Sequence, residues 1–346
     1  MNEVSEFSVK ESFIMLGSRM EALINANDDL DPDKIEFDNV LLNATQKNPW
    51  FTRDNMIRSI AAWADALKRN NVDQWLQPYK GKRTKTTLPK TIGVINAGNI
   101  PLVGFHDLLC VIMSGHAYLG KNATDDPYLL PYLAEKLIEI DPRLKANISF
   151  TERLTGFDAV IATGSNNSAR YFDYYFGKYP HVIRMNRNGV AVLTGDEDDK
   201  DLKNLGNDIF QYFGLGCRNV SKIFLPRNYE IKNFFEAIES RAEVARHHKY
   251  MNNYEYNNAI FLLKRIDFLT NGFLILKEDP AICSPIAVLY YEYYDTLKSL
   301  EEKLFVEKEN IQCIVGKNFI PFGHAQQPQL WDYSDGIDTM YFLGSL

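Results

Sequence analysis

The feature that most constrains the fold is an alternation of short apolar runs with longer amphipathic stretches, which starts at Thr91. The run 91–96, TIGVIN, is rich in β-branched residues and indicates a buried strand. Similar runs follow at 117–120, 159–163 and 182–185, and helical stretches lie after Pro101 and at 127–140 and 166–177. Strands that alternate with helices in this way favour a parallel sheet built from βαβ connections.

The same alternation resumes at Val190 and predicts a second α/β unit. Its expected strands are 190–194, 221–225, 272–277, 287–293 and 311–315, with helices before Cys217 and around 229–241 and 296–304. Two amphipathic helices precede both units; one carries Phe13, Leu16, Met20, Leu23 and Ile24, and the other starts near Thr52 and carries Met56, Ile60, Ala64 and Leu67. We therefore expect a helical cap and linker at 1–90, α/β domains at 91–189 and 190–318, and a C-terminal return segment at 319–346 that is loop-like at 321–328.

One cysteine is placed like a nucleophile. A helix is predicted before it by apolar residues three or four apart and by carboxylates at its start; these are Leu202, Leu205, Ile209 and Phe213, and Asp196 to Asp199. Gly214 and Gly216 end that helix, and Cys217 follows at once. Glycines allow turns that other residues cannot make and let backbone amides approach a bound group. A thiolate placed there can attack an acyl carbon.

The alternative for any intracellular cysteine is simple packing, because cysteine is among the most buried residue types. Cys110 and Cys313 lie in apolar runs and fit that interpretation, while the surroundings of Cys283 are harder to interpret. Only Cys217 has the Gly-x-Gly approach, which favours a chemical role for it alone.

Composition excludes several classes of protein. The 4 cysteines show neither CxxC nor zinc spacing, which argues against a disulfide framework and a structural metal and favours a reducing, cytoplasmic location. A net charge of -7 disfavours nucleic-acid binding. A short basic stretch stands out against this charge, but a solvated linker explains it and we assign it no role; it comprises Lys80, Lys82, Arg83, Lys85 and Lys90.

The sequence also argues against export and membrane insertion. The first residues are polar and acidic, unlike a secretory signal. The longest mostly apolar segment, 100–113, is too short for a bilayer and contains His106 and Asp107. We expect a soluble protein with no membrane span.

Three further motifs fall at the ends of expected strands. The segment after the first strand contains Gly98 and Asn99, and Asn99 either donates its amide to an oxyanion or caps the helix that follows Pro101. Another strand ends in Gly-Lys at Lys121, for which a surface position is the default. A third strand ends in Thr163-Gly164-Ser165 and opens a helix, a geometry that favours a phosphate.

In chain order these motifs resemble the aldehyde dehydrogenase superfamily. The order is Asn-x-Pro after the first strand, Gly-Lys, Thr-Gly-Ser, and then Gly-x-Gly-Cys. The segments 99–104 and around Cys217 are most similar to the acyl-CoA reductases of the LuxC type, the fatty-acid reductase component of bacterial luminescence. The likeness spans roughly 91–225, with weaker matches at 284–286 and 321–323.

The resemblance implies two Rossmann-like α/β domains with an active site in the cleft between them. It also implies roles for individual residues. Cys217 would be the acyl-accepting nucleophile, and Asn99 with the Cys217 backbone amide would form the oxyanion hole. Lys121 would contact the adenosine ribose, and the residues near the bound dinucleotide would be Gly98, Thr163, Gly164 and Ser165.

Two departures from the superfamily refine this expectation. The stretch 185–190, MNRNGV, lacks the glutamate that activates water in the hydrolytic members, so an acyl-enzyme would persist until hydride or another thiol arrives. Thr124 stands where many relatives carry an acidic residue that would repel a 2′-phosphate. The sequence thus favours NADPH over NADH, and reduction of an acyl-CoA or another acyl thioester to the aldehyde.

Rival interpretations stay open. One is reduction of an acyl phosphate within the same superfamily. Another is an inactive relative, since the chain is shorter than typical members, which would bind a nucleotide or a partner protein. A homo-oligomer and an acyl-transfer partner protein are both compatible with the sequence.

Overall fold

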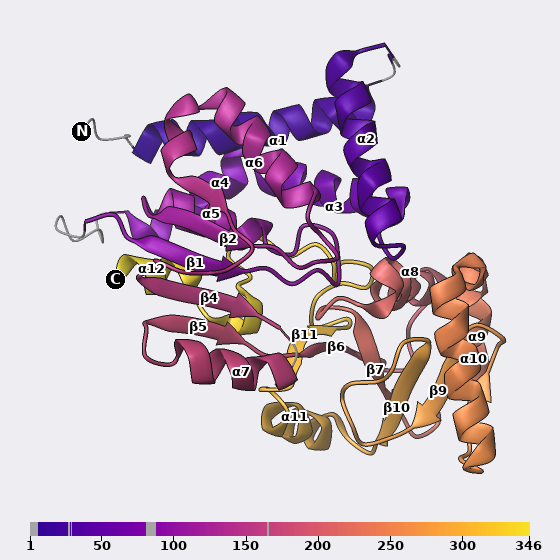
Figure 1. The fold of residues 1–346 in the computed structure, drawn as a ribbon. Helices are drawn as coiled ribbons and strands as arrows, with labels where there is room; N and C mark the ends of the chain where they lie inside the picture. The colour runs from indigo at the N-terminus through magenta and orange to yellow at the C-terminus, as the bar shows by residue number, and fades with distance from the viewer. Residues whose placement is uncertain (1–5, 27, 29, 81–87, 165) are drawn as a thin grey trace. The chain divides into compact units, whose positions relative to one another are not determined.

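The computed structural model describes residues 6–26, 28, 30–80, 88–164 and 166–346. Its contacts divide the chain into two compact units, one formed by Met1–Met185 with Gln329–Leu346 and the other by Asn186–Pro328. Figure 1 follows the chain from the N-terminal helices through both sheets to α12. Three residues of the basic stretch, Lys82, Arg83 and Lys85, lie outside the described residues.

The first unit begins with four helices, α1 (Glu6–Asn25), α2 (Pro32–Lys47), α3 (Arg53–Ala66) and α4 (Arg69–Leu76), followed by the short η1 (Gln77–Tyr79). The periodicity of α1 and α3 predicted both, and Thr52 caps α3 by accepting the Asn55 N–H. α1 packs against α3, α5 and α6 and buries Phe13 and Leu16. Helices α2 and α4 were not predicted from the sequence.

A parallel sheet of five strands follows in the order β3-β2-β1-β4-β5. The strands are β1 (Thr91–Ile95), β2 (Ala117–Lys121), β3 (Ile148–Phe150), β4 (Ala159–Thr163) and β5 (His181–Arg184). They alternate with α5 (Phe105–Met113), α6 (Leu129–Ile140), η2 (Pro142–Ala146) and α7 (Asn166–Phe176). The predicted βαβ architecture is confirmed, and only the three-residue β3 was missed. The strand order reverses between β1 and β4, and ligands of open α/β sheets bind at such a reversal.

The second unit contains a six-stranded sheet in the order β11-β6-β7-β10-β9-β8. Its strands are β6 (Asn188–Val192), β7 (Val220–Pro226), β8 (Leu269–Thr270), β9 (Ile275–Glu278), β10 (Val288–Tyr294) and β11 (Ile311–Val315). Its helices are α8 (Asp199–Phe210), η3 (Gln211–Gly214), α9 (Ile231–Ile238), η4 (Glu239–Arg246), α10 (His248–Leu263) and α11 (Leu297–Val306). All pairings are parallel except β8 with β9.

The C-terminal segment from Gln329 onward belongs to the first unit. It contains η5 (Ser334–Gly336) and α12 (Thr339–Gly344), and α12 packs against α5. Residues 321–328 contain no helix or strand, as the sequence predicted, and the helices of the return segment begin only at Ser334. Among the helices of the described residues, none is long and apolar enough to cross a membrane.

Candidate active site

Asn99 lies in the loop that joins β1 to α5, and several separate elements fix that loop. Asn48, the C-cap residue of α2, donates its side-chain N–H to the Gly98 carbonyl at 3.3 Å. Ser59 of α3 donates its hydroxyl to the Pro101 carbonyl at 2.9 Å. Helix α5 begins at Phe105 with Gly104 at its N-cap position, well beyond Asn99. The capping role considered for Asn99 is therefore wrong.

A buried carboxylate supports the same loop. Asp126 accepts the backbone N–H groups of Leu102 and Leu129, and Leu102 adopts a φ of 60° in the left-handed region. Asp126 is 7% exposed, and this burial raises the pKa of its carboxyl to about 7. Its Oδ1 atom has no hydrogen-bond partner among the described residues. The side chain can therefore carry a proton near neutral pH without giving up either backbone bond.

Gly98 and Lys121 lie at the carboxyl edge of the first sheet, Gly98 in the loop after β1 and Lys121 at the end of β2. Lys121 is the last residue of β2 and pairs with Ile95 of β1, and it is half-buried. A Cβ atom on Gly98 would lie 2.6 Å from the Cβ of Ala123, so glycine lets the two loops approach. The structure thus gives Gly98 a packing role that the sequence alone did not show.

The Thr163-Gly164-Ser165 turn follows β4 at the same edge. Thr163 ends the strand, and α7 starts at Asn166. A Cβ atom on Gly164 would lie 2.9 Å from Ser168 and from the Phe172 ring, so this glycine allows the first turns of α7 to approach the strand. Ser165 lies outside the described residues.

A buried ion pair that was not predicted from the sequence lies beside this turn. Arg184, at the end of β5, places its guanidinium 2.7 and 2.8 Å from the two carboxylate oxygens of Asp107 on α5. It also donates to the Thr339 hydroxyl at 2.9 Å and contacts the Thr163 hydroxyl at 3.4 Å. Both members of the pair are buried, Arg184 to 4% and Asp107 to 4% exposure. A single arginine thus joins α5, β4 and the C-terminal segment.

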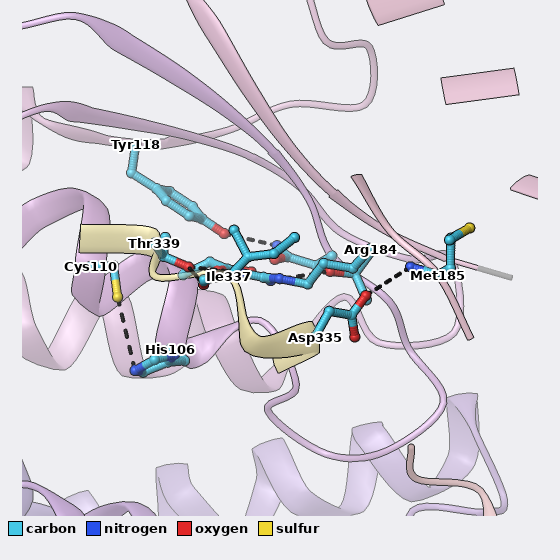
Figure 2. A network of polar contacts seen from close by, with 11 residues as sticks. His106, Cys110, Tyr118, Arg184, Met185, Asp335, Ile337 and Thr339 are labelled. Carbon is cyan, nitrogen blue, oxygen red and sulfur yellow. Dashed lines mark hydrogen bonds and ion pairs between the residues drawn. The ribbon is translucent and has the colours of Figure 1, made fainter. Parts of the chain in front are cut away.

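Figure 2 shows how the C-terminal segment reaches Arg184. The Thr339 hydroxyl, which accepts from Arg184, lies 3.4 Å from the Ile337 carbonyl, and the Asp335 carboxylate accepts the Met185 N–H at 3.1 Å. The same view contains Cys110, whose thiol lies 3.9 Å from Nε2 of His106. Burial raises the pKa of the Cys110 thiol well above its usual range. This thiol is therefore a packing residue, as expected.

The segment before Cys217 differs from the predicted helix. α8 ends at Phe210, and the chain then continues through η3 with Tyr212 and Phe213 at φ values of 53° and 58°. Gly214 extends this left-handed run with a φ of 77°, whereas Gly216 lies outside the positive-φ region. The expectation that the helix continues to Phe213 is wrong; the Phe213 ring instead contacts the His247 ring in a tilted arrangement, with centroids 4.1 Å apart.

Cys217 occupies the tip of a tight turn between η3 and β7. The Asn219 N–H donates to the Gly216 carbonyl at 3.0 Å, which places Cys217 and Arg218 at the two central positions of the turn. Gly189 N–H donates to the Asn219 carbonyl at 2.9 Å. A Cβ atom on Gly189 would lie only 2.6 Å from the Arg218 carbonyl oxygen, so glycine is required at that point of β6.

The four thiols differ in exposure, and the burial of Cys110 and Cys313 agrees with the packing role expected for them. Cys217 is half-buried, Cys110 and Cys313 are buried, and Cys283 is exposed. The Cys313 thiol donates to the Arg218 carbonyl at 3.6 Å, so it contacts the backbone of the turn that carries Cys217. The thiols of Cys217 and Cys283 are thus accessible, and of these two only Cys217 lies on the hydrogen-bonded Gly216–Asn219 turn.

The candidate residues fall into two groups. Gly98, Asn99, Lys121, Thr163 and Gly164 belong to the first unit, and all follow or end its parallel strands. Cys217 belongs to the second unit. The residues of the first group fit a dinucleotide, because small residues and a lysine gather at the carboxyl edge of a parallel sheet where its strand order reverses.

Comparisons with known proteins agree with this architecture. Residues 19–249, more than half of the chain, match the family model described as acyl-CoA reductase (LuxC). A curated relative is the long-chain acyl-protein thioester reductase 2 of Photobacterium leiognathi, 20% identical over 177 residues. That match covers 46% of this chain and 37% of the relative's length.

Solved structures of aldehyde dehydrogenases share the fold. Aldehyde dehydrogenase 21 from Physcomitrella patens, in complex with the reaction product succinate, gives a TM-score of 0.65 at 15% identity. The match covers 90% of this chain and 74% of that enzyme. The NAD+ complex of an aldehyde dehydrogenase from Bacillus cereus gives a TM-score of 0.61 at 13% identity. The match covers 90% of this chain and 72% of that enzyme. The chain is thus a member of the acyl-CoA reductase (LuxC) family and has the aldehyde dehydrogenase fold.

Proposed function

We propose that this protein reduces an acyl thioester to the aldehyde through an acyl group carried on Cys217. The observation that carries the proposal is the half-buried thiol at the tip of the Gly216–Asn219 turn, in a chain of the LuxC family. In its thiolate form Cys217 attacks the acyl carbon, the carbon–sulfur bond of the donor breaks, and the donor thiolate leaves. The acyl group then remains on the enzyme.

A nicotinamide cofactor, when bound, supplies the hydride that reduces the acyl group. Lys121, Thr163, Gly164 and Ser165 are the residues that would hold it, with Gly98 beside them. We propose NADPH, because the neutral Thr124 would not repel a 2′-phosphate. The chain's own contribution to the chemistry is the thiol, together with donors for the acyl oxygen from Asn99 and the Cys217 backbone amide. Removal of one such donor typically costs about a hundred- to a thousand-fold in turnover.

The donor we propose is a long-chain acyl group on a thiol, either that of coenzyme A or that of a protein. The family model names acyl-CoA, and the Photobacterium relative is named for acyl-protein thioesters. Both donors present the same reacting group, a carbonyl carbon bonded to sulfur. Acyl phosphates present a different leaving group and serve as the comparison substrate.

The first test is to mix the protein with a long-chain acyl-CoA in the absence of cofactor and to measure its intact mass. One acyl adduct is expected on wild type and on Cys283→Ala, which removes the exposed thiol, and none on Cys217→Ala. Asn99→Ala should retain normal cofactor affinity but lose most of its turnover. If Cys217→Ala acquires the adduct, or if only an acyl phosphate acylates wild type, the proposal is wrong.

A further inference from the structure

We propose that Asn219 is the positioning residue for Cys217, because its carboxamide ties the turn that carries the thiol to the end of α8. This inference rests on the proposed role of Cys217 and deepens it. Asn219 is 1% exposed, so water cannot replace the bonds that its side chain makes.

The side-chain amide nitrogen of Asn219 contacts backbone carbonyls at the end of α8. Nδ2 lies 3.0 Å from the Asp208 carbonyl, 3.3 Å from the Ile209 carbonyl and 2.8 Å from the Gln211 carbonyl. The last carbonyls of an α-helix have no partner inside the helix, and the chain after Phe210 leaves the helical conformation with Tyr212 and Phe213 in the left-handed region. The two N–H groups of Asn219 are therefore directed at the carbonyls that end α8 and begin η3.

The side-chain amide oxygen of Asn219 contacts the Gly216–Asn219 turn that carries Cys217. Oδ1 accepts the Gly216 N–H at 2.8 Å, while the Asn219 backbone N–H donates to the Gly216 carbonyl at 3.0 Å. Both peptide groups that flank Gly216 are thus held by the same residue. Because Cys217 directly follows Gly216, the backbone that sets the direction of its thiol is fixed relative to α8.

Only asparagine has this combination of groups at this length. Aspartate has no N–H donors and would place a negative charge among three carbonyl oxygens, close to the thiol. Alanine would leave both the helix carbonyls and the Gly216 N–H without these partners. Displacement of the Cys217 thiol should slow acylation and leave cofactor affinity unchanged, since the candidate cofactor residues belong to the other unit.

The experiment compares Asn219→Ala and Asn219→Asp with Asn257→Ala. Asn257 is a matched control, because it is also buried in the second unit and donates to two backbone carbonyls, those of Asn253 and Ile286, at 2.9 and 3.0 Å. Each protein is checked for folding by circular dichroism. The rate of acylation by acyl-CoA is then followed by intact mass, and NADPH affinity is measured by fluorescence.

A second readout is alkylation by iodoacetamide as a function of pH, mapped by peptide mass. The exposed Cys283 serves as an internal reference within each protein. We expect Asn219→Ala to acylate about ten- to a hundred-fold more slowly than wild type, with NADPH affinity and Cys283 alkylation unchanged. In Asn219→Asp the midpoint for alkylation of Cys217 should move to higher pH, because a nearby carboxylate disfavours the thiolate.

The inference is overturned if folded Asn219→Ala acylates within about twofold of wild type, or if Asn257→Ala slows acylation equally. Should Asn219→Ala fail to fold, Asn219→Asp decides: an unchanged alkylation midpoint for Cys217 overturns the inference. A wild type that forms no adduct contradicts the proposed function instead, and the alkylation profiles still test the role of Asn219 separately.

Discussion

At the scale of single residues, two buried aspartates use the same kind of partner in different ways. Asp126 accepts two backbone N–H groups and leaves Oδ1 without a partner among the described residues. Asp208 accepts Gly323 N–H on one oxygen at 2.6 Å and Ala325 N–H on the other at 2.9 Å. Burial raises the pKa of Asp126 to about 7 and that of Asp208 to about 6.

These raised pKa values fix the sign of a pH effect. An aspartate whose pKa is higher in the folded state binds more protons when folded, so its contribution to the free energy of unfolding falls as pH rises from about 4 to about 7. Between pH 5 and pH 8, ionisation of Asp126 should lower the free energy of unfolding of wild type by roughly 1–3 kcal/mol. Asp126→Asn should remove most of this dependence, because its NH₂ takes the position of the unpartnered oxygen.

The measurement is urea unfolding at both pH values, followed by tryptophan fluorescence. All 4 tryptophans, Trp50, Trp63, Trp75 and Trp331, belong to the first unit, so the signal reports the unit that contains Asp126. Asp208→Asn is the contrasting variant. In this variant the side-chain NH₂ must face a backbone N–H. Its free energy of unfolding, followed by circular dichroism, should therefore fall by about 1–3 kcal/mol. Equal behaviour of the two variants would contradict this assignment of partners.

The residues proposed to carry chemistry could be singled out from the sequence, whereas the residues proposed to position them could not. Cys217, Asn99 and Lys121 follow strands or glycine turns, and such positions can be recognised locally. Asn219 and Arg184 could not be recognised, because their partners lie on other elements. The four partners of Asn219 are backbone groups, which leave no mark on residue type.

At the scale of elements, apolar periodicity predicted where the chain is regular and failed where long-range contacts decide. β1, β2 and β4 lie within a residue of their expected limits. α8 is the instructive failure: its apolar spacing continues to Phe213, yet the helix ends at Phe210 and Phe213 packs on His247. A tertiary contact there replaces the last turn of the helix.

The C-terminal segment yields a prediction at this scale. Thr339 is fully buried and accepts a hydrogen bond from Arg184. Thr339→Val keeps the shape but leaves a buried guanidinium N–H without that acceptor, which should lower the free energy of unfolding by about 1–3 kcal/mol. Thr339→Ser keeps the hydroxyl and should lose only about 1 kcal/mol for the missing methyl group.

Urea unfolding followed by tryptophan fluorescence distinguishes the two variants, since Thr339 lies in the unit that holds every tryptophan. A valine variant as stable as the serine variant would show that Arg184 does not depend on this contact.

At the scale of the whole molecule, the candidate thiol and the candidate cofactor residues belong to different compact units. The two half-reactions should therefore respond to different substitutions. Lys121→Ala should weaken NADPH binding yet still accept an acyl group on Cys217. Cys217→Ala should bind NADPH normally and accept no acyl group, as intact mass and NADPH fluorescence would show. A variant in either group that abolished both properties while folded would contradict this division of labour.

The central claim is that the acyl group on Cys217 is discharged by reduction and not by water. The stretch 185–190 contains no carboxylate that could activate water, and hydride transfer to a thioester carbonyl needs no such base. The most direct measurement isolates the acylated protein, divides it between buffer alone and buffer with NADPH, and follows free acid and aldehyde over time. The account predicts that aldehyde appears with NADPH much faster than acid appears without it. Acid released in buffer as quickly as aldehyde is formed with NADPH would contradict the account and place a water-activating base elsewhere in the chain.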